Sequence, residues 1–158
     1  ILISHGYRIA QVTVDNSDSI WALAYRKTLE NGRDKDIMIR LRQEYVPYML
    51  AKVDFYERTS IALLGYNLPH VWLLHANELN AVTYADLIAT IRKRGYRFVS
   101  LEEAMQDDAY KRPDEFKGRF GPSWLHRWAI AEKKPRVFYE GEPTVPQWVM
   151  DLAGVDSE

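Results

Sequence analysis

The sequence has no cysteine among its 158 residues, so disulfide bonds, thiolate chemistry and cysteine-based metal sites are excluded. It also has no apolar run near the roughly 20 residues that cross a bilayer, so we expect no membrane partner. Its charges nearly cancel, with 21 Lys and Arg against 22 Asp and Glu, and give no electrostatic case for binding nucleic acid. What is present, 47% hydrophobic and 27% charged residues, is typical of a globular domain with a core.

Three segments share one pattern, in which a glycine–tyrosine pair follows a helical pattern and leads into a short apolar run. The pairs begin at Gly6, Gly65 and Gly95, and the runs cover 9–14, 71–74 and 98–101. A glycine that ends a helix ahead of a short loop and a strand is typical of repeated helix–strand units. We therefore predict an α/β fold with parallel strands covered by helices.

Apolar spacing predicts helices over 20–30, 36–64, 83–94 and 124–133. Ser17 or Asp18 can cap the first, and Pro47 should kink or split the second. In the third, Tyr84, Leu87, Ile88 and Ile91 should face inward, whereas the proline-rich tail should be irregular. A polar stretch from residue 107 divides the chain into 1–106 and a C-terminal extension, 107–158, packed on it by its tryptophans.

Candidate chemistry gathers where two predicted strands end. Asp15 and Asp18 follow the run 9–14, and His75 follows the run 71–74. Carboxyl ends of parallel strands open on one edge of a sheet, so we expect these side chains to be close. An aspartate beside a histidine fixes the imidazole tautomer and suits the ring for acid–base catalysis. A histidine bonded to a backbone group and helix-capping aspartates are the alternatives, and the spacing leaves both open.

The order of three motifs adds a family resemblance. Thr13-Val14-Asp15-Asn16-Ser17-Asp18, then Leu73-Leu74-His75-Ala76-Asn77, then the stretch 93–101 resemble the C-terminal half of the polysaccharide deacetylase (NodB-homology, carbohydrate esterase) family. The resemblance covers about residues 1–130. It implies part of a distorted (β/α) barrel with parallel strands, and a divalent metal, usually Zn²⁺, that polarises an acetyl carbonyl and activates water.

The resemblance also implies a role for each candidate residue. His75 would be the general acid that protonates the leaving amine, Asp18 its orienting partner, and Asp15 the first aspartate of that motif. Trp21 and Asn77 would contact the substrate, an N-acetylated polysaccharide or oligosaccharide. Ser19 and Ala76 depart from the family pattern, which often has Trp and Asp there.

The metal ligands and the catalytic base lie earlier in the family's chain, so no metal ligand is predicted here. The first residues, Ile1 to Gly6, are typical of the last turn of a helix, and three strands cannot close a barrel. We therefore expect a C-terminal portion that depends on a missing N-terminal half and is inactive alone. The resemblance suggests a periplasmic or secreted protein. A catalytically silent carbohydrate-binding or scaffold member of the same fold, and a doubly wound α/β partner-binding domain, are the other hypotheses.

Overall fold

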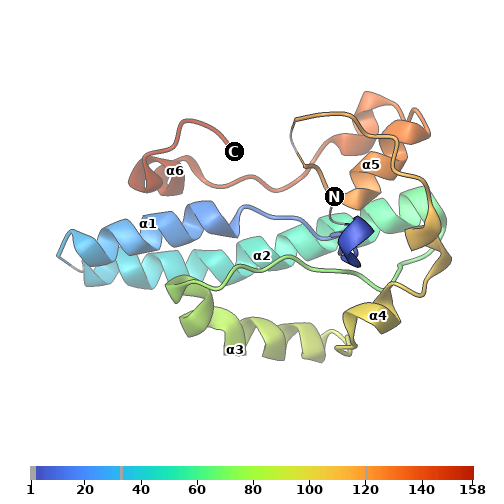
Figure 1. The fold of residues 1–158 in the computed structure, drawn as a ribbon. Helices are drawn as coiled ribbons and strands as arrows, with labels where there is room; N and C mark the ends of the chain where they lie inside the picture. The colour runs from blue at the N-terminus through green and yellow to red at the C-terminus, as the bar shows by residue number, and fades with distance from the viewer. Residues whose placement is uncertain (1–2, 33, 120) are drawn as a thin grey trace. The chain divides into compact units, whose positions relative to one another are not determined.

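The computed structural model describes residues 3–32, 34–119 and 121–158, and helices dominate it (Figure 1). The α-helices are α1 (Asp18–Glu30), α2 (Lys35–Leu64), α3 (Glu78–Lys93), α4 (Leu101–Ala104), α5 (Trp124–Ala131) and α6 (Gln147–Ala153). Short 3-10 helices among the described residues are η1 (Ile3–His5), η2 (Asp108–Lys111) and η3 (Arg136–Tyr139). No helix in this part of the chain combines the length and the apolar character that a membrane span requires.

The predicted α/β fold, a partial (β/α) barrel with parallel strands, is wrong. Over the described residues the chain forms no sheet, and its strand-like pairing is one isolated parallel bridge between Val14 and Trp72. Beside this bridge, the backbone N–H groups of Thr13 and Val14 both donate to the carbonyl oxygen of Val71, at 2.9 and 3.0 Å. The structure is therefore helical, and a barrel is not an adequate description of it.

The apolar runs led to a wrong prediction of strands because apolar character indicates burial but not how the backbone pairs. A strand becomes part of a sheet only when neighbouring strands take up its N–H and C=O groups. Here side chains bond to some of these backbone groups in place of a neighbouring strand. Val71 N–H donates to Thr13 Oγ1 at 2.9 Å, and Asn16 Nδ2 donates to the Leu73 carbonyl at 2.7 Å. In the third run Phe98 is 49% exposed, so it is not a core strand.

The helix ends follow the local signals in the sequence. The Asn77 side chain accepts a hydrogen bond from Asn80 N–H and caps α3, which therefore starts five residues before the predicted Thr83. At its other end Gly95 has φ +89°, its N–H donates to Arg92 O, and Tyr96 N–H donates to Ile91 O. These two bonds are the Schellman pattern that a glycine favours, so the predicted glycine end of this helix is confirmed.

Two helical segments differ from the prediction. α2 continues through Pro47 without being split, because large side chains along it, including Leu41, Tyr45 and Met49, are fully buried and stabilise it by packing. The tail predicted to be irregular contains α6, which begins after Pro146 and ends at Gly154, with φ +64°. Val149 and Ala153 of α6 are fully buried, so this short helix is also held by packing.

The chain forms two compact units, each assembled from three segments. The first comprises Ile1–Asp15, Tyr56–Trp72 and Phe98–Glu140, and the second comprises Asn16–Phe55, Leu73–Arg97 and Gly141–Glu158. In the first unit His126 of α5 lies against Tyr56 and Tyr139, with ring centroids 5.4 Å apart in both pairs. The proposed boundary between residues 106 and 107 stays a prediction.

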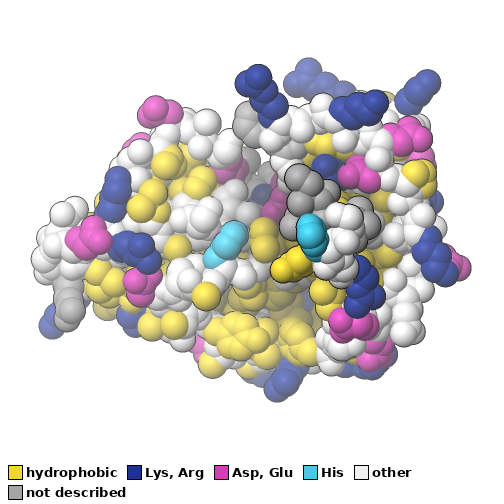
Figure 2. All heavy atoms as spheres, in the orientation of Figure 1, with side chains coloured by type: hydrophobic (Ala, Val, Ile, Leu, Met, Phe, Trp, Pro, Cys, Tyr) yellow, Lys and Arg dark blue, Asp and Glu magenta, His cyan; other side chains and the backbone are white. Residues whose placement is uncertain are grey.

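In the second unit α1 packs against α3 and α6. Trp21 of α1 is fully buried and lies against the rings of Tyr45, Tyr48 and Trp148, with centroids 5.3 to 6.3 Å apart. On α3, Leu87 and Ile91 are buried as predicted, but Tyr84 is 53% exposed, so its inward placement was wrong. Figure 2 shows hydrophobic side chains at the surface over α3, where Val82 is also exposed.

Candidate active site

Asp18 and His75 lie at the starts of two helices of the second unit that pack on each other. Asp18 is the first residue of α1, and its N–H donates to Asn16 Oδ1 at 2.9 Å. The side chain of Ser17 makes no capping bond. The capping bond that was predicted for Ser17 or Asp18 is made by the Asn16 side chain. His75 lies two residues before Asn77, the cap of α3. The packing of α1 against α3 therefore places the Asp18 carboxylate beside His75.

The Asp18 carboxylate bonds to His75 at two points. Oδ2 accepts the backbone N–H of His75 at 2.9 Å, and Oδ1 lies 2.6 Å from the ring nitrogen Nδ1. The Asp18 side chain is fully buried, whereas the His75 side chain is 54% exposed. Because Nδ1 is bonded to the buried carboxylate, Nε2 is the nitrogen that can exchange a proton with a molecule from solution.

Asn80 and Tyr45 extend this arrangement into the core. Asn80 Nδ2 donates to Asp18 Oδ2 and to the His75 carbonyl oxygen, both at 2.8 Å. The hydroxyl of Tyr45 donates to Asn80 Oδ1 at 2.6 Å. Burial, assisted by the nearby Asp18 charge, raises the pKa of Tyr45 well above its ordinary value, so this phenol stays a neutral donor.

The structure brings together only part of the predicted site. Asp18 and His75 are in direct contact, whereas Asn77 is occupied as the α3 cap, and its Nδ2 donates to the His75 carbonyl at 3.2 Å. Trp21 has no exposed surface, so nothing in its placement supports the predicted contact with substrate. Asp15 is the half-buried last residue of the first unit's leading segment. The catalytic and substrate-binding roles of these residues stay predictions.

Sequence reasoning missed Asn80 and Tyr45. Asn80 occupies the same face of α3 as Thr83, Leu87 and Ile91, all buried, and a polar amide at the head of such a stripe is a detectable signal. Buried amides need partners, so an asparagine at this position could have indicated a hydrogen-bond network. Tyr45 carried a weaker signal, because a tyrosine on an apolar stripe of α2 more often belongs to the core.

The metal implied by the family resemblance was expected to take its ligands from outside this chain. Across residues 3–32, 34–119 and 121–158, no group of three or more His, Asp or Glu side chains could hold a metal ion. A zinc site in proteins usually takes at least three such ligands. The expectation of a metal in the complete domain therefore stays a prediction.

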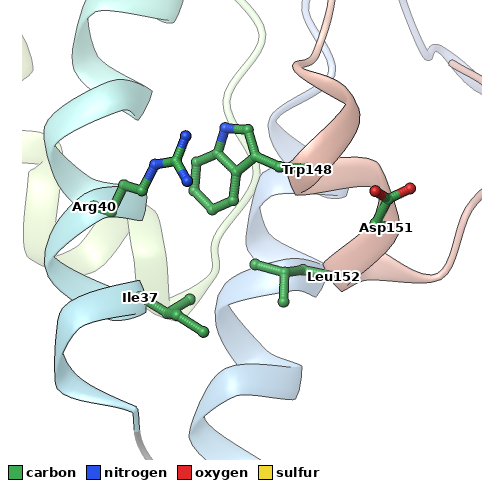
Figure 3. Close-up of a pocket in the computed structure, with 5 residues that line it drawn as sticks. All are labelled: Ile37, Arg40, Trp148, Asp151 and Leu152. Carbon is green, nitrogen blue, oxygen red and sulfur yellow. The ribbon is translucent and has the colours of Figure 1, made fainter.

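A groove of about 360 Å³ in the second unit is lined by Ile37, Arg40, Trp148, Asp151 and Leu152 (Figure 3). Arg40 lies over the indole of Trp148, with its guanidinium carbon 3.9 Å from the ring centroid. Trp148 Nε1 donates to Glu44 Oε2 at 3.0 Å, and Glu44 also pairs with Arg40. Because the guanidinium covers one face of the indole, that face is not free to stack on a sugar ring.

His70, in the first unit, has a different environment from His75. Its Nδ1 lies 3.1 Å from Thr13 Oγ1, and its Nε2 lies 2.8 Å from Asn67 Oδ1. Burial lowers the pKa of His70 to about 4, so its ring is neutral at physiological pH. A neutral ring can donate to the Asn67 oxygen and accept from the Thr13 hydroxyl, which is a structural role.

Comparisons of the chain with protein families, curated proteins and solved structures gave no match. The function is therefore inferred from the geometry around Asp18 and His75 and from the sequence resemblance described above.

Proposed function

We propose that Asp18 and His75 form the proton-transfer pair of a hydrolase that removes acetyl groups from a sugar polymer. The observation that carries the proposal is the 2.6 Å contact between Asp18 Oδ1 and His75 Nδ1, with the carboxylate buried and the ring exposed. An imidazole held by a buried acceptor on one nitrogen and open on the other is the arrangement used in general acid–base catalysis.

The substrate class comes from the sequence resemblance. In hydrolysis of an N-acetyl group, water adds to the acetyl carbon and the C–N bond then breaks, releasing acetate, while the protons of the attacking water pass to the solvent. The electron pair of that bond goes to nitrogen, which needs a proton to leave as an amine. A protonated His75 donates it from Nε2 and becomes neutral, while its Nδ1–H stays bonded to Asp18. Water supplies the next proton to Nε2.

The test is acetate release from N- and O-acetylated oligosaccharides by the full natural chain, compared with His75→Gln. Loss of a positioned general acid costs on the order of 10²- to 10⁴-fold in turnover. His5→Gln is the matched control, because it removes an exposed histidine from the other unit. Acetate release that falls at least 100-fold in His75→Gln and not in His5→Gln supports the proposal. No release by the wild type, or unchanged release by His75→Gln, overturns it.

A further inference from the structure

Asn80 contacts both members of the acid–base pair. Its amide nitrogen uses one hydrogen on Asp18 Oδ2 and the other on the His75 carbonyl oxygen, each at 2.8 Å. The residue is only 6% exposed, so water cannot readily replace either bond. Both hydrogens of the buried Asn80 amide are therefore bonded to Asp18 and His75, the two residues whose relative position determines the proton transfer.

Tyr45 reinforces the direction in which the Asn80 amide faces. A neutral phenol donates its hydrogen, and the Tyr45 hydroxyl lies 2.6 Å from Asn80 Oδ1. If the amide were reversed, its oxygen would face the Asp18 carboxylate, and two acceptors would be in contact without a hydrogen between them. Since the phenol is buried against Trp21 and stays protonated, it holds the NH₂ group toward Asp18.

The orientation of Asn80 in turn fixes the Asp18 carboxylate and, through it, the imidazole of His75. Oδ2 accepts two hydrogens, one from Asn80 Nδ2 and one from the backbone N–H of His75. These two donors hold the carboxylate with Oδ1 directed at His75 Nδ1. A carboxylate that acts as an acceptor at Oδ1 requires the hydrogen of this contact to be on Nδ1.

We propose that Asn80, oriented by Tyr45, is a positioning residue that fixes the neutral His75 ring as the Nδ1–H tautomer and keeps Nε2 for proton exchange. This inference deepens the proposed function and rests on it, since the tautomer matters only if His75 transfers protons. Its structural part is nevertheless measurable without any turnover. Asn80 touches neither the exposed edge of the ring nor a substrate, and acts through Asp18.

The experiment is an NMR measurement of the ring nitrogens of His75 in the full ¹⁵N-labelled chain, at a pH where the ring is neutral. The signals are assigned by their loss in His75→Gln. The wild type should show a protonated Nδ1 and a bare Nε2. Asn80→Leu removes the amide, and we expect the ratio of the two tautomers to change roughly tenfold toward Nε2–H. Tyr45→Phe, which removes the donor to Asn80 Oδ1 and so loosens the amide, should change it several-fold in the same direction.

Thr83→Val is the matched control. Thr83 is a 3% exposed residue of the same helix whose hydroxyl donates to Leu79 O at 2.8 Å, away from the pair. It should keep the wild-type tautomer ratio. If Asn80→Leu does not fold, the tautomer ratio of Tyr45→Phe tests the inference, because this variant loses a single oxygen and keeps the ring packed on Trp21. A wild-type His75 in the Nε2–H form, or a wild-type ratio in folded Asn80→Leu or Tyr45→Phe, overturns the inference.

Acetate release separates this inference from the proposed function. If the tautomer changes as expected but the wild type releases no acetate, the proposed function fails and the positioning role stands. If His75→Gln abolishes release while Asn80→Leu keeps the wild-type tautomer, the positioning role fails and the proposed function stands. If both hold, Asn80→Leu should lower kcat with KM little changed, because no substrate contact is removed.

Discussion

Two oxygens of Asp18 face two nitrogens of His75. Oδ2 accepts the backbone N–H at 2.9 Å and fixes the main chain ahead of α3, while Oδ1 lies 2.6 Å from Nδ1 and fixes the ring. A single buried carboxylate therefore positions both the segment that carries the histidine and the imidazole itself. It follows that Asp18 contributes to stability as well as to the proposed chemistry, and that the two contributions can be measured separately.

Asp18→Asn should destabilise the fold by about 1–3 kcal/mol. One oxygen becomes an NH₂ group. If it faces the donors of His75 and Asn80, it leaves them without an acceptor; if it faces Nδ1, a bond to a buried carboxylate is replaced by a weaker neutral bond that requires the Nε2–H tautomer. Urea unfolding followed by circular dichroism measures the free energy of unfolding. Asp36→Asn, also in the first turn of a helix but exposed, should change that free energy by less than about 0.5 kcal/mol. Equal values for both variants would contradict the structural role of Asp18.

His70 should make the fold less stable in acid. Burial lowers its folded-state pKa to about 4, below the value of 6.5 that applies to an unfolded chain. Between these two values the unfolded chain binds more protons than the folded one, so stability falls as pH decreases from 6.5 toward 4. Below about pH 4 the loss is complete. Since the ring is only half-buried, we expect this loss to be about 1–3 kcal/mol.

Unfolding midpoints of the wild type and His70→Gln, measured from pH 7 to pH 4, isolate this contribution. Glutamine can donate to Asn67 and accept from Thr13 but does not titrate in this range, so the variant's stability should fall less steeply with pH. Carboxylates titrate in both proteins, and their effect cancels in the difference. His5→Gln, which alters an exposed histidine, serves as the control. Parallel pH curves for wild type and His70→Gln would show that His70 is not held neutral by the fold.

The helices of the second unit were largely predictable, because their signals are local. Asn77 and Gly95 mark the two ends of α3, and Leu87 and Ile91 mark its buried face. The contact between Asp18 and His75 was also expected, but from a strand topology that the structure does not have. The two side chains meet because α1 packs on α3 and both residues lie at helix starts.

The rest could not be predicted from one sequence because it depends on contacts between distant segments. Nothing near Val71 indicates whether its N–H will pair with a strand or, as here, with the Thr13 side chain. Tyr45 and Asn80 are 35 residues apart, and only the packed helices bring the phenol to the amide. Trp21 was expected to contact a substrate because of the family resemblance, and its burial against Tyr45 and Trp148 depends on segments far away in the sequence.

The buried ion pair between Lys52 and Glu142 should respond asymmetrically to mutation. Lys52 Nζ lies 2.7 Å from Glu142 Oε1, and the Lys52 side chain is 5% exposed against 29% for Glu142. Glu142→Gln leaves a buried ammonium group without its counter-charge, and we expect a loss of about 3 kcal/mol. Lys52→Met removes the charge and keeps the apolar stem, so its loss should be below about 1 kcal/mol, and the double variant should resemble it. Urea unfolding of the three variants measures this, and a Glu142→Gln loss no larger than that of Lys52→Met would show that the ammonium group reaches water in solution.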